Sequence, residues 1–149
     1  MLTSRGKYGL KAMLYLARVP VGEHAQVADI AARNTISKKF LDTILLDLQH
    51  AGFVRSRKGP GGGYTLSRPP GEITVGAVVR ALNGSLAPLA CADPATYAPC
   101  PDCSCPASCA VRLIMTDVGT AISDILDGTT LASLAARGQA AEAGWYYAI

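Results

Sequence analysis

The chain has 149 residues, of which 50% are hydrophobic and 17% are charged, and its formal net charge is +3. This composition argues against a disordered chain, and the length fits one domain or a domain with an appendage. No stretch approaches the roughly 18 consecutive apolar residues of a membrane span, and the first residues lack the apolar core of a signal peptide. We therefore expect a cytoplasmic protein that does not enter a membrane.

The charges are unevenly distributed along the chain. Residues 1–70 carry eleven Lys and Arg against four acidic residues, a net charge of +7, whereas residues 71–149 carry three against seven, a net charge of −4. A basic half joined to a mildly acidic half indicates a nucleic-acid-binding face and a separate sensing or assembly face. A chance asymmetry would look the same, so charge alone leaves both readings open.

Residues 1–52 carry the pattern of three helices. The first has apolar residues at i, i+3, i+4 and i+7, and these are Leu10, Met13, Leu14 and Ala17. A second, short helix is predicted to end near Asn34. The third begins after the N-cap Ser37 and ends at Gly52, a left-handed position that favours glycine. Two short helices joined by the turn 34–36 indicate a helix-turn-helix.

A β-hairpin is predicted directly after these helices. Two β-type runs, residues 53–57 and 64–68, flank a turn that contains four glycines and one proline. A basic hairpin that follows a helix-turn-helix is typical of a winged helix. The glycine-rich turn lacks the Lys-Ser/Thr ending of a phosphate-binding loop, so we do not expect it to bind a nucleotide.

Two further helices are predicted in the second half of the chain. Thr74 is the expected N-cap of a helix that ends at Gly84. Beyond a loop rich in proline and cysteine, an apolar stripe about four turns long indicates a long helix. Its members are Val111, Ile114, Met115, Val118, Ile122, Ile125 and Leu126.

We interpret the long helix as a dimerisation helix. A winged helix has already used its own apolar faces for its core, so a second amphipathic helix beyond it is expected to pair with a copy of itself. The alternative is that the stripe packs on its own domain. After a short turn of helix at 129–134, the aromatic segment 144–149 has no role that we can assign.

The expected fold is mainly α with a small β-hairpin wing, a winged helix-turn-helix plus a long dimerisation helix. The predicted parts are a DNA-binding domain (1–70), a connecting helix (71–87), a cysteine-rich sensor loop (88–109), a dimerisation helix with a short terminal helix (110–135), and a tail (136–149).

In such a fold the third helix enters the major groove of DNA and the wing tip approaches the minor groove. The residues expected to read bases are Ser37, Lys38, Lys39, Asp42 and Thr43 on the helix, with Lys58 and Gly59 on the wing. The residues expected to contact phosphates are Arg5, Lys7, Arg55 and Arg57. Phe40 lies on the apolar stripe, which favours a place in the core.

All five cysteines fall within nineteen residues, and they are Cys91, Cys100, Cys103, Cys105 and Cys109. Their number is odd and nothing indicates secretion, so a disulfide framework is not expected. Clustered thiols in a reducing compartment indicate a metal site, an iron–sulfur cluster or a redox sensor.

These motifs together resemble the IscR/NsrR-type regulators of the Rrf2 family. The resemblance covers about residues 1–135 in the family's order and rests on the segments 2–8, 36–41, 57–64, 69–75 and 130–134 and on the cysteines between the fourth and fifth helices. It implies a homodimeric winged-helix repressor or activator of transcription. Its binding to operator DNA would be controlled by an iron–sulfur cluster that senses redox state, iron or nitric oxide.

The resemblance also implies the ligands. Cys103 and Cys109 reproduce the family's Cys-x5-Cys pair, and Cys91 stands where the first ligand does. In one branch a histidine three residues after the last cysteine completes the site, but here that residue is Arg112. In other branches the partner's first helix supplies a carboxylate, but residues 7–9 have none. The fourth ligand is therefore unassigned, with Cys100 or Cys105 as candidates, and a two-iron or a four-iron cluster would fit.

Other readings of the loop stay open. A zinc site would need four thiolates, although the spacing of Cys103 and Cys105 is tighter than in common zinc knuckles. A disulfide switch without a metal, and a structural loop with incidental cysteines, are further alternatives. An iron–sulfur redox carrier without a DNA function is a remote one. The sequence has no nucleotide loop and no catalytic constellation, so we do not expect an enzyme.

Overall fold

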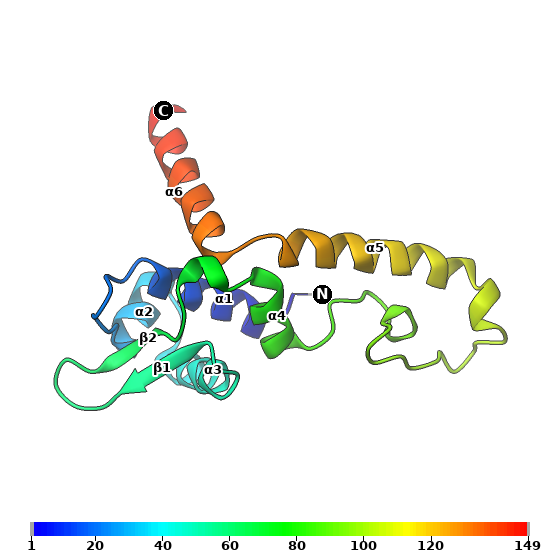
Figure 1. Ribbon diagram of the computed structural model, residues 1–149, viewed down its shortest axis with the longest axis horizontal. Coiled ribbons are helices and arrows are strands. Elements are labelled where there is room, and N and C mark those ends of the chain that lie inside the picture. The colour runs from blue at the N-terminus through cyan, green and yellow to red at the C-terminus, as the bar shows by residue number, and fades with distance from the viewer. Residues whose placement is uncertain (1, 149) are drawn as a thin grey trace.

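The computed structural model describes residues 2–148, and side chains up to residue 144. It is mainly α-helical with one two-stranded antiparallel hairpin, which confirms the predicted fold class (Figure 1). The helices and strands are α1 (Ser4–Ala17), α2 (Val27–Asn34), α3 (Lys38–His50), β1 (Val54–Arg57), β2 (Gly63–Leu66), α4 (Val75–Asn83), α5 (Ala110–Asp127) and α6 (Leu131–Ala148). Three short 3₁₀ turns span Pro70–Glu72, Ala90–Ala92 and Pro106–Ser108.

The predicted helix ends are confirmed where a local signal fixes them. The Ser37 hydroxyl accepts a hydrogen bond from the Phe40 amide at 3.2 Å, and the Thr74 hydroxyl accepts one from the Ala77 amide at 3.2 Å. Each bond satisfies one of the free amides in the first turn of a helix. Gly52, two residues after α3, has a φ of +83°. All three signals lie within a few residues of the end that they set.

The turn between α2 and α3 completes the helix-turn-helix. Thr35 ends α2 in the left-handed conformation, with a φ of 54°. The next amide, of Ile36, returns to the Ala31 carbonyl at 3.0 Å. Ile36 is buried, so the turn is held by the core beneath it as well as by its own hydrogen bonds.

Helix α1 differs from its prediction. It begins at Ser4, six residues before the first residue of the predicted stripe, and the Thr3 hydroxyl caps it by accepting from the Gly6 amide. Three of the four residues of the predicted stripe, Leu10, Leu14 and Ala17, are only partly buried. The fully buried face consists of Gly6, Gly9, Ala12, Met13 and Leu16. This face is shifted because α1 packs closely against α4: a Cβ on Gly9 would overlap Leu82.

One core joins the first four helices and the hairpin. Its members come from α1, α2, α3, α4 and β1, and Leu131 at the start of α6 closes it with no exposed surface. Val78 and Leu82 place α4 inside this core, so the helix predicted as a connector packs with the helices of residues 1–52. We call residues 2–86 the body.

The wing is attached to the body near its tip. The hairpin register runs from Val54 opposite Leu66 to Arg57 opposite Gly63. Tyr64 also exchanges two backbone hydrogen bonds with Ala25, at 2.8 and 2.9 Å. The Gln26 side-chain amide donates to the Gly62 carbonyl at 2.6 Å. These bonds fix the wing relative to the start of α2.

Outside the body, α5 forms a long arm (Figure 1). Residues 88–109, the cysteine loop, run from the body alongside α5 and join it at its N-terminal end. Helix α6 extends from the body in another direction. Gly119 is the one buried residue that α5 contributes within the described side chains. Helix α6 extends to Ala148, although the sequence predicts only a short turn followed by a tail. Within the described residues, no helix is long and apolar enough to cross a membrane.

Candidate DNA-binding surface and cysteine loop

Most of the predicted DNA-contacting residues lie on α3, on its N-cap or on the wing, whereas Arg5 and Lys7 lie on α1. Helix α3 packs against β1, so the two lie side by side in Figure 1. Most of the predicted side chains are exposed, and these are Lys7, Ser37, Lys38, Lys39, Thr43, Arg55, Arg57, Lys58 and Gly59. Arg5 and Asp42 are half-buried. The fold therefore leaves most of the predicted contact residues accessible to solvent.

Three of the expected base or phosphate contacts, Lys38, Asp42 and Arg5, form ion pairs within the protein. Lys38 Nζ lies 3.3 Å from an Asp42 carboxylate oxygen, one turn along α3. Arg5 forms an ion pair with Asp47, which joins α1 to α3. Both pairs are partly exposed, where such contacts contribute up to about 1 kcal/mol. Asp47 thus holds the Arg5 guanidinium, whereas Lys39 forms no ion pair among the described residues.

The positive charge of the wing, unlike that of α3, is not interrupted by acidic residues. Arg55, Arg57 and Lys58 are exposed, and no acidic residue lies between residues 53 and 68. Burial, together with the negative charge of Asp42, raises the pKa of Tyr64. Asp42 on α3 therefore lies within electrostatic reach of Tyr64 on β2.

Sequence reasoning missed the residues that position the wing. Gln26 and Ala25 bind it through the bonds described above, and a Cβ on Gly63 would overlap the Ala25 carbonyl. Gly63 has a φ of +136°, which an L side chain rarely adopts. The glycine run was the available signal, but the sequence does not say which glycine meets another segment.

The structure brings two of the five cysteines together. Cys91 is buried, and the Sγ atoms of Cys91 and Cys100 lie 3.8 Å apart. Cys103 and Cys109 are half-buried and Cys105 is exposed. Within residues 2–148, no three His, Cys, Asp or Glu side chains converge as metal ligands would. The set Cys91, Cys103 and Cys109 is therefore not assembled, and that assignment stays a prediction.

The thiols differ in acidity. The hydrogen bond and the negative charge of Cys91, followed by burial, raise the pKa of Cys100. The Ser108 hydroxyl and then the backbone amides of Ser108 and Ala107 lower the pKa of Cys105. An exposed thiol with a lowered pKa forms the nucleophilic thiolate more readily. Of the two thiols whose pKa is shifted, Cys105 therefore forms a thiolate more readily than Cys100.

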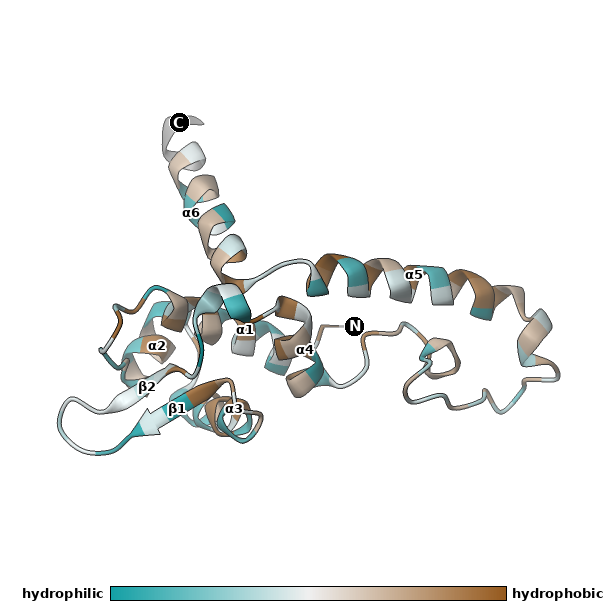
Figure 2. Cartoon of the chain, in the orientation of Figure 1, coloured by the Kyte–Doolittle hydropathy of each residue, from teal (hydrophilic) through white to brown (hydrophobic). Residues whose placement is uncertain are grey.

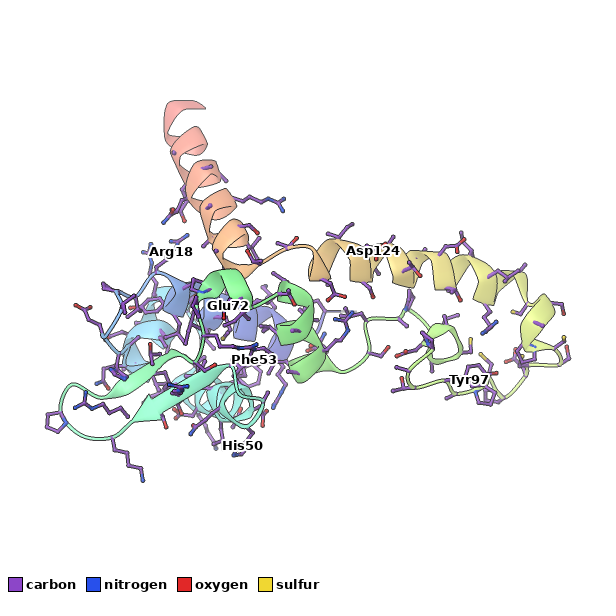
Figure 3. The ribbon with its side chains drawn as sticks, viewed as in Figure 1. Arg18, His50, Phe53, Glu72, Tyr97 and Asp124 are labelled. Atoms are coloured by element: carbon purple, nitrogen blue, oxygen red, sulfur yellow. The ribbon has the colours of Figure 1, made fainter. Side chains whose placement is uncertain are left out.

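Arg112 joins α5 to the cysteine loop. Its Nε donates to the Cys91 carbonyl at 2.9 Å and a terminal nitrogen donates to the Pro106 carbonyl at 3.4 Å. Its guanidinium carbon lies 5.8 Å from the centre of the Tyr97 ring. Tyr97 is on the part of the loop that runs beneath α5 (Figure 3). An open cavity of about 750 Å³, lined by residues of the loop, α4 and α5, lies beside this contact.

Helix α5 leaves an apolar seam uncovered. Hydrophobic residues recur along it in Figure 2. The spacing of three and four residues places five of them on one line, which we call the seam: Val111, Ile114, Val118, Ala121 and Ile125. The four larger side chains are between 38% and 66% exposed. The other side of α5, through Ile122 and Leu126, packs on Val75, Val79 and Leu86.

A helix-turn-helix with a basic wing braced beside its third helix defines a winged-helix DNA-binding protein. The model of the Rrf2 family, described as an iron-dependent transcriptional regulator, matches residues 2–137. The chain belongs to this family, and it is a transcriptional regulator rather than an enzyme.

Individual relatives agree with the family assignment. An Rrf2-like HTH-type transcriptional regulator of Rhodobacter capsulatus is 38% identical over 144 residues, which cover 95% of this chain and 96% of the relative. The HTH-type transcriptional regulator IscR of Aliivibrio salmonicida is 35% identical over 133 residues, covering 89% and 76%.

Among solved structures, CymR of B. subtilis, called the global cysteine regulator, matches with a TM-score of 0.76 and 31% identity, covering 92% of this chain and 97% of that one. IscR of T. potens matches with a TM-score of 0.73 and 26% identity, covering 95% and 90%. The oxidized form of Staphylococcus aureus CymR matches with a TM-score of 0.70 and 30% identity, covering 91% and 95%.

Proposed function

We propose that the protein is a homodimer that binds a pseudo-palindromic operator, and that an iron–sulfur cluster held by the cysteine loop sets the strength of binding. The observation that carries the proposal is the position of the loop. Five thiols lie between the body, which carries the DNA-binding surface, and α5, which carries the uncovered seam. A change in the loop would therefore act on α5, the helix that sets the distance between the DNA-binding surfaces of the two copies.

The exposed seam supports a dimer. Its residues follow the a and d positions of a heptad, which two copies of α5 bury against each other in a coiled coil. Exposed side chains in such a line are costly in water, at roughly 25 cal/mol for each Å² of apolar surface. Pairing through the seam leaves Arg112 and the cavity on a different side of α5.

Each copy of the dimer would use α3 in the major groove and the wing in the minor groove. Ser37, Lys38, Lys39, Asp42 and Thr43 would lie near the bases, with the Ser37 hydroxyl free to donate because its oxygen already accepts from Phe40. Lys58 and Gly59 would approach the minor groove. The phosphate contacts would come from Arg5, Lys7, Arg55 and Arg57.

The donors of the loop fit an iron–sulfur cluster in kind and number, because thiolates are the ligands that such clusters take. Cys91, Cys103 and Cys109 would hold it, with Cys100 or Cys105 as the fourth ligand. The family's description as iron-dependent supports this assignment. When bound, the cluster supplies sensitivity to oxidants, iron supply or nitric oxide. The loop must close to bring Cys103 and Cys109 towards Cys91, since they do not converge in the structure.

The test begins with protein purified without oxygen. We expect a brown protein with matched iron and sulfide, no zinc, and an absorption that bleaches in air. Cys103→Ala should remove most of the iron, whereas the matched variant Ser104→Ala, one residue away, should keep it. A colourless wild-type protein without iron would refute the cluster.

The DNA-binding half has its own test. An operator is first selected from random duplexes, and its affinity is then measured against salt concentration. A protein that neutralises several phosphates loses affinity steeply as salt rises. Removing the cluster should change the operator affinity of the wild type but not that of Cys103→Ala. An affinity that is independent of salt would contradict the proposed surface.

The Cys91–Cys100 contact favours a second candidate, a disulfide switch on the same fold. The two Sγ atoms at 3.8 Å need a small movement to reach the bond length of about 2.05 Å. A hydroperoxide would be the oxidant: each thiol gives up one proton and one electron, the disulfide forms, and the peroxide is reduced to an alcohol and water. This candidate needs no metal.

Thiol counting separates the two candidates. For a disulfide switch, peroxide should remove two titratable thiols per chain from iron-free protein, with the change in operator affinity reversed by dithiothreitol. Cys100→Ser should abolish the loss, whereas Cys109→Ser should retain it. An unchanged thiol count in the wild type would refute the switch.

A further inference from the structure

We propose that Arg112 is the positioning residue that transmits the state of the cysteine loop to α5. The inference rests on the proposed function, because it assumes that the loop responds to a signal. It goes beyond that function in naming one side chain, outside the cysteine set, through which the response passes. A single guanidinium on α5 binds the loop backbone at both ends of the cysteine segment.

The two bonded carbonyls lie on either side of the loop. Cys91 is the first cysteine of the chain, and Pro106 lies between Cys105 and Cys109. A planar guanidinium has its donors in a fixed fork, so the two bonds set the distance between these segments. Any rearrangement that moves Cys91 relative to Pro106 must break one bond or turn the Arg112 side chain.

Arg112 is placed to pass such a movement to the seam. It lies in the first turn of α5, next to Val111 and two residues before Ile114, both of which belong to the seam. The opposite end of α5 is anchored to the body, because Arg80 on α4 binds both carboxylate oxygens of Asp127, at 2.5 and 2.9 Å. A pull at Arg112 therefore rotates or shifts a helix that is fixed at its far end.

The surroundings of Arg112 permit this movement. The cavity of about 750 Å³ lies between α5 and the loop, so the loop does not pack flush against the helix there. Within the described residues, no carboxylate pairs with Arg112. Its contacts are two backbone carbonyls and one aromatic ring, Tyr97. All three lie in the loop, so the side chain follows the loop rather than the body.

Arginine at this position acts by hydrogen bonding. It stays protonated and offers donors with no acceptor, so it cannot ligate iron or zinc. A lysine would retain the charge but not the fork. Replacing Arg112 by lysine therefore distinguishes a role for the positive charge alone from a role for two simultaneous hydrogen bonds.

The experiment compares operator affinity in two states of the full-length protein: purified without oxygen, and the same sample after treatment with diamide. The variants are Arg112→Ala, Arg112→Lys and the matched control Arg137→Ala, an exposed arginine on α6. Coupled sites usually change affinity by about 5- to 150-fold, so we expect a wild-type ratio in that range and a ratio below about twofold for Arg112→Ala. Arg112→Lys should give an intermediate ratio, and Arg137→Ala should match the wild type.

Two further readouts separate coupling from folding. Helix content and dimer mass of Arg112→Ala should equal those of the wild type, and amide exchange should quicken in residues 91–109 and in the first turn of α5. A wild-type ratio retained in Arg112→Ala would overturn the proposal. So would a loss of operator binding in both states. If the wild type itself shows no ratio, the sensing function fails instead, and the amide-exchange comparison still tests the contact.

Discussion

The body and the α5 arm treat the same kind of residue in opposite ways. On α3, Leu41, Leu45 and Leu48 are completely buried, whereas on α5 Ile114 and Ile125 are 53% and 66% exposed. Both helices are amphipathic and of ordinary composition. The difference is that α3 has α1, α4 and β1 around it, while most of one side of α5 faces solvent.

This contrast indicates which part of the molecule is complete. The body has its own core and can hold the DNA-binding surface rigid. The arm leaves the apolar side chains of the seam exposed to solvent. In the proposed dimer a second chain would cover this surface, and a change in the position of the arm would alter the spacing between two constant DNA-binding surfaces.

The largest effect is expected from a charge in the seam. Val118→Asp would place a carboxylate from each copy in the buried contact, where an unpaired charge costs several kcal/mol. We expect a monomer by sedimentation, a body that still unfolds cooperatively, and a loss of operator binding. Leu113→Asp, at a more exposed position off the seam (53% against 38% for Val118), should remain dimeric. Dimerisation of Val118→Asp would show that the seam is not the contact.

Within the body, two adjacent leucines give the next largest contrast. Leu45 is 0% exposed and Leu46 is 47% exposed. Leu45→Ala should lower the free energy of unfolding by about 2–5 kcal/mol, and Leu46→Ala by less than about 0.5 kcal/mol. Urea denaturation of the dimer at fixed concentration measures both. Similar values for the two variants would contradict the burial of this face of α3.

A glycine pair tests how the wing is held. Gly63→Ala would place a Cβ against the Ala25 carbonyl at a positive φ, which costs of the order of 1–3 kcal/mol. Because the strain falls on the wing, we expect weaker operator binding along with lower stability. The exposed Gly71 has nothing within 4 Å of a built Cβ, so Gly71→Ala should leave both quantities close to wild type. Operator affinity by fluorescence anisotropy distinguishes the two.

The smallest effect is a pH dependence in the loop. Hydrogen bonds from the Ser85 and Thr96 hydroxyls and from the Ala95 amide lower the pKa of Asp93 to about 2, from its ordinary 3.8. Because the pKa is lower in the folded state, the ionised Asp93 stabilises the folded loop at pH values above 3.8. This stabilisation is lost as the pH falls through about 2. Carbon-13 NMR of the Asp93 carboxyl should show the low midpoint, and Thr96→Val should raise it. A midpoint near 3.8 in the wild type would contradict these bonds.

The elements of the body were predictable because their signals are local. Ser37, Thr74 and Gly52 each set a helix end through atoms within a few residues, and a glycine-rich turn between two β-type runs defines a hairpin. The buried face of α1 was not predictable in the same way. It depends on α4, more than sixty residues away, closing on Gly9.

The arm and the loop were less predictable for a related reason. The long apolar stripe of α5 identifies a helix, but α6 lacks such a stripe beyond Leu134, and its alanine-rich second half gave no periodic signal. The cysteines are identified by type alone, since a loop has no repeat that places Cys91 beside Cys100. The ion pair of Arg5 with Asp47 joins two helices, so no sequence spacing reveals it.

The position of the cysteine loop has a consequence for how such proteins diverge. Within the described part of the chain, Cys91 and Ala92 are buried, but no residue from 88 to 109 belongs to the core of the body or to the cluster of Val75, Val79 and Leu86. Mutations there leave the packing of the DNA-binding helices intact, so descendants can gain, lose or exchange thiols without refolding the rest. Recognition of an operator and recognition of a signal can therefore evolve separately, and one DNA-binding fold can be combined with loops that respond to different chemical signals.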